Sequence, residues 1–133
     1  MSVRRLHIGI RNAAERSRAL HEAMRRVASG DRPAEKAGLY FENIEELRRI
    51  LTEKRLELLF AISRHRPESM HQLAGLVERD YKNVNTDITL LHGLGLVTLE
   101  AKAGKGRAQV PRVPYDEIQV TIDLRNQRPA HAA

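Results

Sequence analysis

The sequence contains no cysteine and no tryptophan. Without thiols the chain cannot form disulfides, thiolate metal sites, iron–sulfur clusters or a cysteine nucleophile. Aromatic residues are also scarce, and only five occur in 133 positions: Tyr40, Phe41, Phe60, Tyr81 and Tyr115. Hydrophobic residues make up 41% of the chain, so we expect one modest core.

Long hydrophobic runs are absent as well. The longest, Leu58–Ile62, has five residues, about a quarter of what a membrane-spanning helix needs. The arginines near the N-terminus are not followed by a long apolar segment, so this end does not resemble a signal peptide. These features predict a soluble cytoplasmic protein with no membrane partner.

Known catalytic motifs are missing too. The sequence has no P-loop, no Gly-x-Gly-x-x-Gly and no Gly-x-Ser-x-Gly, and its six histidines are dispersed without metal-ligand spacing. We therefore predict no catalytic residues, no metal, no cofactor and no enzymatic activity. Sensing of a small ligand stays open, because the linker at 31–38 and the helix at 43–51 could border a pocket.

Positive charge is concentrated at the two ends of the chain. The net charge is +6, and the first thirty residues hold seven arginines against two acids. A second, acid-free cluster consists of Lys102, Lys105, Arg107 and Arg112. Such a distribution suits a polyanion, because fixed cations release counterions from phosphate. The same excess also keeps a protein soluble, so charge alone does not decide between these interpretations.

The first half of the chain predicts alternating strands and helices. Leu6, Ile8 and Ile10 alternate with His7 and Gly9, which is typical of a strand with one buried face. The remaining expected elements are a helix from Asn12 to Gly30, a linker at 31–38, a strand at Leu39–Phe41 and a helix that begins after Asn43.

Three helices are predicted after residue 52. Their expected N-caps are Thr52, Ser69 and Asp80. Their expected apolar faces are Leu56, Leu59 and Phe60 in the first helix, Met70, Leu73, Ala74 and Val77 in the second, and Val84, Ile88 and Leu91 in the third. Strands then follow at 96–99 and 107–113, joined by a turn at Gly104–Gly106, and a last alternating strand spans 118–124.

This order of elements is that of a winged helix-turn-helix. We predict an α+β, mostly helical fold, because helix, short helix, turn, helix and a hairpin with a basic tip follow one another. The predicted organisation is an N-terminal strand–helix extension and linker at 1–42, a winged helix-turn-helix at 43–114, a C-terminal strand at 115–124 and a disordered tail at 125–133.

The third helix, at 81–94, is the expected recognition helix. Burial of its apolar face leaves five polar side chains for the major groove: Lys82, Asn83, Asn85, Thr86 and Thr89. Asn pairs with adenine, Thr offers a methyl or a hydroxyl group, and Lys reaches guanine or phosphate. An acid would be unfavourable on this face, so Asp87 is expected toward the flank.

Further DNA contacts are expected around that helix. The basic wing at 102–112 brings Lys102, Lys105 and Arg107 to a phosphate or the minor groove. Ser69 and His71 begin the second helix, whose positive end favours phosphate. Tyr81 either stacks on the DNA backbone or covers the second helix. Polar residues on an exposed helix and basic hairpin tips are commonly just solvated, and it is their joint occurrence in this order that favours DNA.

Several strings resemble a family of small prokaryotic winged-helix regulators. They are Thr52–Leu59, Asp80–Val84, Leu94–Val97 and Val113–Ile118, within a likeness that covers about residues 39–124. The chain is similar to MarR- and ArsR-type repressors in general and to TumA-type predicted antitoxins in particular. It lacks the cysteine ligands of metal-sensing ArsR proteins. The resemblance implies binding of double-stranded operator DNA as a homodimer, with autoregulation of a two-gene operon.

Two function hypotheses follow. In the first, the protein is a sequence-specific repressor that binds two half-sites about one helical turn apart. In the second, it is an antitoxin that mainly binds a toxin protein, through the segment at 4–28 or the strand at 118–124, and DNA binding is secondary. Apolar strands that lack a cover favour a dimer.

Overall fold

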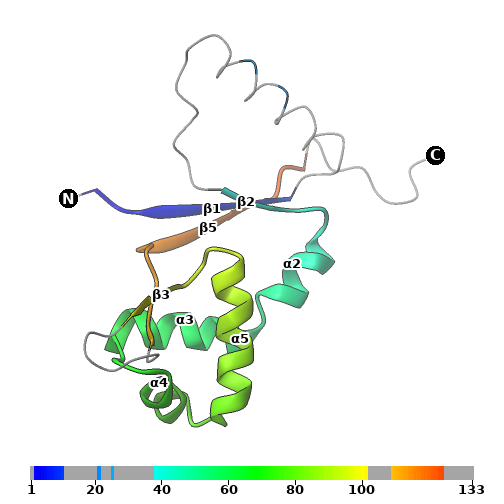
Figure 1. Cartoon of the computed structure of the whole chain (residues 1–133). Helices are drawn as coiled ribbons and strands as arrows, with labels where there is room; N and C mark the ends of the chain where they lie inside the picture. Colours follow the sequence, from blue (N-terminus) through cyan, green and yellow to red (C-terminus); the bar gives the residue numbers. More distant parts are fainter. Residues whose placement is uncertain (1, 11–20, 22–24, 26–37, 102–108, 125–133) are drawn as a thin grey trace. The chain divides into compact units, whose positions relative to one another are not determined.

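The computed structural model describes residues 2–10, 21, 25, 38–101 and 109–124. These residues form an α+β structure, as the sequence predicts, and it contains four helices and two small sheets (Figure 1). Four predicted features lie largely outside the described residues: the helix at 12–30, of which positions 21 and 25 are helical, most of the linker at 31–38, the turn at 104–106 and the tail at 125–133.

Contacts divide the chain into two units. We call residues 1–4 and 50–116 the helical unit, and residues 5–49 and 117–133 the sheet unit. Both units therefore contain segments from the beginning of the chain and from its later part. No helix among the described residues is long and apolar enough to cross a membrane.

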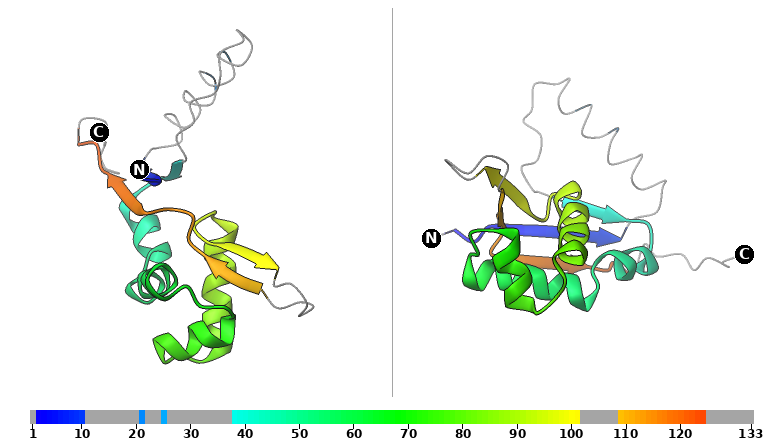
Figure 2. Two further views of the ribbon diagram at one scale, coloured as in Figure 1. Left: turned by 90° about the vertical axis from the view of Figure 1, so that its left-hand side faces the viewer. Right: turned by 60° about the horizontal axis from the view of Figure 1, so that its bottom comes forward.

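The helical unit consists of three helices and an antiparallel strand pair. The helices are α3 (Glu53–His65), α4 (Met70–Val77) and α5 (Tyr81–Gly93). Strands β3 (Thr98–Ala101) and β4 (Gln109–Arg112) run side by side (Figure 2). Strand β4 contacts both α3 and α4. The predicted first strand of this pair thus begins two residues later than expected, whereas the returning strand lies within its predicted range.

All three predicted N-cap positions of this unit are confirmed, and two of them carry a side-chain capping bond. The hydroxyl of Thr52 accepts a hydrogen bond from the Arg55 amide at 3.3 Å, and that of Ser69 accepts from Gln72 at 3.0 Å. Asp80 stands at the N-cap of α5, but its side chain makes no capping bond, and its backbone carbonyl accepts from the Val84 amide instead. The predicted cap position is therefore confirmed, but the carboxylate does not take part in it.

The core of the helical unit is built from one face of each helix. Val84, Ile88 and Leu91 of α5 are buried, as predicted. The prediction for Phe60 is wrong, because 65% of this residue is exposed. Helix α3 buries Leu58, Leu59 and Ile62, which lie on the side of the helix away from Phe60.

The sheet unit holds three parallel strands. They are β1 (Arg5–Ile10), β2 (Gly38–Phe41) and β5 (Glu117–Thr121), in the order β2-β1-β5 (Figure 2). All three strands were predicted, although the last one ends at Thr121 and not at residue 124 as expected, and their pairing was not predicted. Helix α2 (Ile44–Ile50) follows β2, and the Asn43 side chain caps it by accepting from the Glu46 amide at 2.9 Å.

The two faces of this sheet differ in character. Leu6, Ile8 and Ile10 of β1 are buried, as their alternation predicts. On the other face the ring of Tyr40 lies so close to Gly9 and Gly38 that a Cβ atom at either glycine would come within 3.0 Å of it. The glycines thus make room for the aromatic ring.

Candidate nucleic-acid interface

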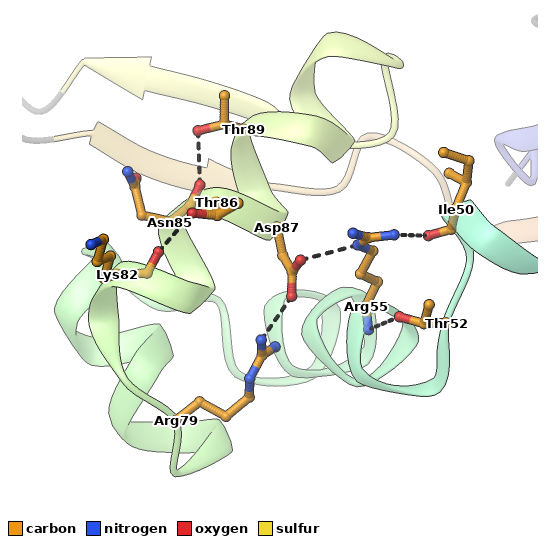
Figure 3. A network of polar contacts seen from close by, with 9 residues as sticks. All are labelled: Ile50, Thr52, Arg55, Arg79, Lys82, Asn85, Thr86, Asp87 and Thr89. Carbon is orange, nitrogen blue, oxygen red and sulfur yellow. Dashed lines mark hydrogen bonds and ion pairs between the residues drawn. The ribbon is translucent and has the colours of Figure 1, made fainter.

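Helix α5 presents one continuous polar face. Lys82, Asn85, Thr86 and Thr89 are all exposed and lie at i, i+3, i+4 and i+7, opposite the buried stripe of this helix (Figure 3). Asn83 is exposed too, but it lies about 100° around the helix from Lys82. The structure therefore brings together four of the five predicted base-reading residues and separates the fifth from them.

The two threonines of this face use their hydroxyl hydrogens within α5. Thr86 Oγ1 donates to the Lys82 carbonyl at 3.0 Å, and Thr89 Oγ1 donates to the Asn85 carbonyl at 2.8 Å (Figure 3). Back-bonding of this kind is common for threonine inside helices. It leaves the methyl group and one acceptor position of each side chain for an external partner.

Asp87 is the one acid of α5, and it is turned away from this polar face. Its carboxylate accepts from Arg55 Nε of α3 at 3.1 Å and from Arg79 Nη2 at 2.8 Å (Figure 3). Only 14% of its side chain is exposed, and the side chains of Arg55 and Arg79 are 20% and 17% exposed. Two charge-assisted contacts therefore neutralise Asp87 and hold α5 against α3 and against the turn that precedes it.

This network extends to the backbone before α3. Arg55 Nη1 donates to the Ile50 carbonyl at 2.9 Å (Figure 3). Sequence reasoning did not identify the network, because Arg55 and Asp87 are 32 positions apart and no local spacing relates them. The available signal was a single acid in an otherwise acid-free helix.

The start of α4 and the start of α5 are joined by a ring contact. The imidazole of His71 stacks on Tyr81 with ring centroids 4.2 Å apart and planes 15° from parallel. Of the two interpretations of Tyr81, the structure thus contains the contact with the second helix, although 40% of this residue remains exposed. Ser69 is occupied as an acceptor by the α4 cap.

The predicted wing is only partly described. Lys102, Lys105 and Arg107 lie outside the described residues. Arg112 belongs to the same basic cluster, and its Nη1 atom donates to the carbonyls of Pro67 and Pro111 at 2.6 and 2.7 Å. This arginine therefore ties β4 to the turn after α3.

We also searched the described part of the chain for a metal site and for a polar pocket with free charged groups. No three His, Asp or Glu side chains there could hold a metal ion together. A polar pocket of about 160 Å³ lies beside Arg4, Arg112 and Asp116. Hydrogen bonds from the Arg4 backbone amide and from its guanidinium lower the pKa of Asp116 below its usual value of 3.8. Arg4 and Arg112 thus already have partners in the chain.

A family model matches the part of the chain that contains this face. Residues 50–120, more than half of the chain, match the family model HVO_A0114. The matched segment contains the whole polar face of α5 and the residues that anchor Asp87. No curated protein matches the chain.

Proposed function

We propose that this chain, which belongs to the HVO_A0114 family, is a sequence-specific regulator that binds double-stranded DNA through a winged helix-turn-helix. Helices α4 and α5, with the turn at 78–80, form the helix-turn-helix, and β3 and β4 form the base of the wing. The order of these elements and the length of the turn support the proposal.

One observation carries the proposal: the exposed face of α5 contains Lys82 and no acid, because Arg55 and Arg79 hold Asp87 away from it. The side chains left on this face match the chemistry of base edges in the major groove. Asn85 pairs with adenine through two hydrogen bonds, and Lys82 reaches guanine or a phosphate. The threonine methyl groups contact the thymine methyl group.

The proposed mode of action is repression by a homodimer. Two copies place their α5 helices in successive major grooves, so that half-sites lie about one helical turn apart. Control of the protein's own operon, as an antitoxin of a toxin–antitoxin pair, follows from the resemblance to winged-helix regulators.

Two asparagines on α5 provide a matched test. We expect Asn85→Ala to weaken binding to the operator about tenfold or more, because one bidentate base contact contributes ~1–3 kcal/mol of discrimination. Asn83→Ala removes the same group from the same helix but off the polar face, so the loss should be several times smaller. Fluorescence anisotropy measures both, and equal losses would mean that a different face of α5 meets DNA.

Lysine 82 gives a second, charge-based test. Lys82→Ala should lower the slope of log affinity against log salt concentration by about one, because the protein then brings one cationic side chain fewer to a phosphate or a guanine. Lys54→Ala on α3 also removes one exposed positive charge of the helical unit, but it lies off the polar face of α5 and should leave the slope unchanged. If the two variants change the slope equally, only net charge has been measured.

The alternative function is binding of a toxin protein, and the sheet unit favours it. Val120 of β5 and Ile122, just after this strand, are 45% and 49% exposed, an apolar surface of the kind that a partner covers. A Lys82→Ala/Asn85→Ala double variant separates the functions. DNA binding should fall while binding of the co-transcribed partner protein survives, whereas joint loss in a folded variant would count against separate surfaces.

A further inference from the structure

Helix α3 carries an exposed aromatic residue in a chain that has few. Phe60 is 65% exposed, and Leu76 of the adjacent helix α4 is 41% exposed. Both border a depression of about 380 Å³ in the helical unit, which Ala61 and Val77 also line. Exposed apolar side chains that gather in one patch are typical of interaction surfaces, so this depression is a candidate site for a partner.

The charges around Phe60 form a self-complementary pattern. Glu57, Phe60, Ala61 and Arg64 lie at i, i+3, i+4 and i+7 and therefore share one face of α3. Positions 57 and 64 are equally far from the midpoint between 60 and 61. An antiparallel copy of the same helix, crossing at that midpoint, brings Glu57 of each chain beside Arg64 of the other.

The apolar residues obey the same symmetry. In this antiparallel arrangement Phe60 of one chain faces Ala61 of the other. Ala61, Leu76 and Val77 all line the depression. Because the side chain of alanine is small, a phenylalanine ring from the second chain fits there and contacts Leu76 and Val77. Neither Glu57 nor Arg64 forms an ion pair with another described residue, so both charges are available to a second chain.

We propose that the α3 face made of Glu57, Phe60, Ala61 and Arg64 is the homodimer interface of this protein, with a second copy of the chain as its occupant. The inference rests on the homodimer of the proposed function but not on DNA binding. None of the exposed residues of the α5 polar face lines the depression, so dimerisation leaves that face open. Strand β5, in contrast, already pairs with β1 of its own chain.

Charge reversal tests the proposal directly. We expect Glu57→Arg or Arg64→Glu alone to raise the dissociation constant of the dimer about tenfold, because each change replaces two attractive contacts by two repulsive ones. The Glu57→Arg/Arg64→Glu double variant restores complementarity and should dimerise like the natural chain. An equimolar mixture of the two single variants should form a heterodimer for the same reason.

Sedimentation equilibrium of the full chain, without DNA, measures these constants over a range of concentrations. Glu45→Arg on α2 is the matched control, because it reverses an exposed charge in the sheet unit and should leave the mass unchanged. Phe60→Ala removes the apolar centre and should give a monomer with unaltered circular dichroism, since Phe60 is not part of the core.

A monomeric natural chain, or single variants that dimerise normally, would overturn the proposal. Loss of association in both single variants without rescue in the mixture would overturn it too. These outcomes are independent of DNA binding, which is measured separately with a half-site. A monomer that still binds a half-site would refute the interface and leave the proposed regulator intact.

Discussion

At the scale of single residues, Asp87 decides the electrostatic character of α5. A carboxylate on the exposed face would repel phosphate, and here two arginines from other segments hold it inward. The same contacts fasten α5 to α3. One side chain therefore serves both the stability of the helical unit and the polarity of its exposed face.

Removal of this carboxylate should destabilise the protein. We expect Asp87→Ala to lower the free energy of unfolding by about 2–4 kcal/mol, because it leaves two largely buried guanidiniums without their common partner. Urea denaturation followed by circular dichroism measures the loss.

Asp116→Asn is the matched control for that experiment. It also breaks a carboxylate–arginine pair, but Arg4 and Asp116 are 64% and 49% exposed, and exposed pairs contribute little. Equal destabilisation by the two variants would refute the role given to Asp87.

The pKa of Asp116 provides a test at low pH. Because the pKa of its carboxyl is depressed in the folded protein, its contribution to stability is present above the unfolded value near 3.8 and is lost as pH falls through the folded value. The Arg4 backbone amide is the larger cause of the depression. Carboxyl NMR titration of an Arg4→Ala variant should therefore still find a pKa below 3.8, and a return to 3.8 would contradict this assignment.

Phe60 shows why sequence alone misplaces individual residues. An apolar residue one position after Leu59 fits the hydrophobic pattern of α3, yet a helix has room for only one buried stripe. Leu58 and Ile62 occupy that stripe together with Leu59. The contacts of Arg55 and Arg112 escaped prediction for a different reason, since Asp87 and Pro67 lie 32 and 45 positions away from them and only the fold brings them together.

At the scale of elements, short sequence patterns predicted well which segments form helices and which form strands. The caps at Thr52 and Ser69, the apolar spacing of α5 and the alternation in β1 each depend on neighbours within one or two turns, which the sequence displays directly. Parallel pairing of β1 with β2 and β5 depends on long-range contacts, with Arg5 opposite Glu117. No short window of sequence contains that information.

Gly75 and Gly95 allow the effect of backbone conformation on stability to be measured apart from the effect of side-chain packing. Gly95 has φ of +82° after α5, and Gly75 lies inside α4, while a Cβ atom at either position would meet nothing within 4 Å. We expect Gly95→Ala to destabilise the protein by about 1 kcal/mol or more, because a left-handed backbone disfavours a side chain. Gly75→Ala should stabilise it by about 1 kcal/mol through helix propensity.

Urea denaturation measures the free energy of unfolding of both alanine variants, which we expect to change in opposite directions. Because a Cβ atom has open space at both positions, steric overlap cannot cause a difference between the two variants. If Gly95→Ala stabilised the protein, the backbone at residue 95 could not have the left-handed conformation described here.

At the scale of the whole molecule, the proposed regulator depends on three features. In the proposal, the basic excess of the chain attracts a polyanion, the acid-free face of α5 reads bases, and the α3 face pairs two copies so that two half-sites are read together. Charge alone would give binding that ignores sequence and weakens steeply with salt. Specific regulation requires the second and third features as well.

The most direct test of this account is fluorescence anisotropy of the protein with the DNA upstream of its own gene and with scrambled DNA, at two salt concentrations. The account predicts tight binding to the upstream DNA that survives competitor and weakens only moderately with salt, and at least 1,000-fold weaker binding to scrambled DNA, on the order expected for specific recognition. Equal, steeply salt-dependent binding to both DNAs would contradict it, because the charge of +6 would then be sufficient to explain the interaction.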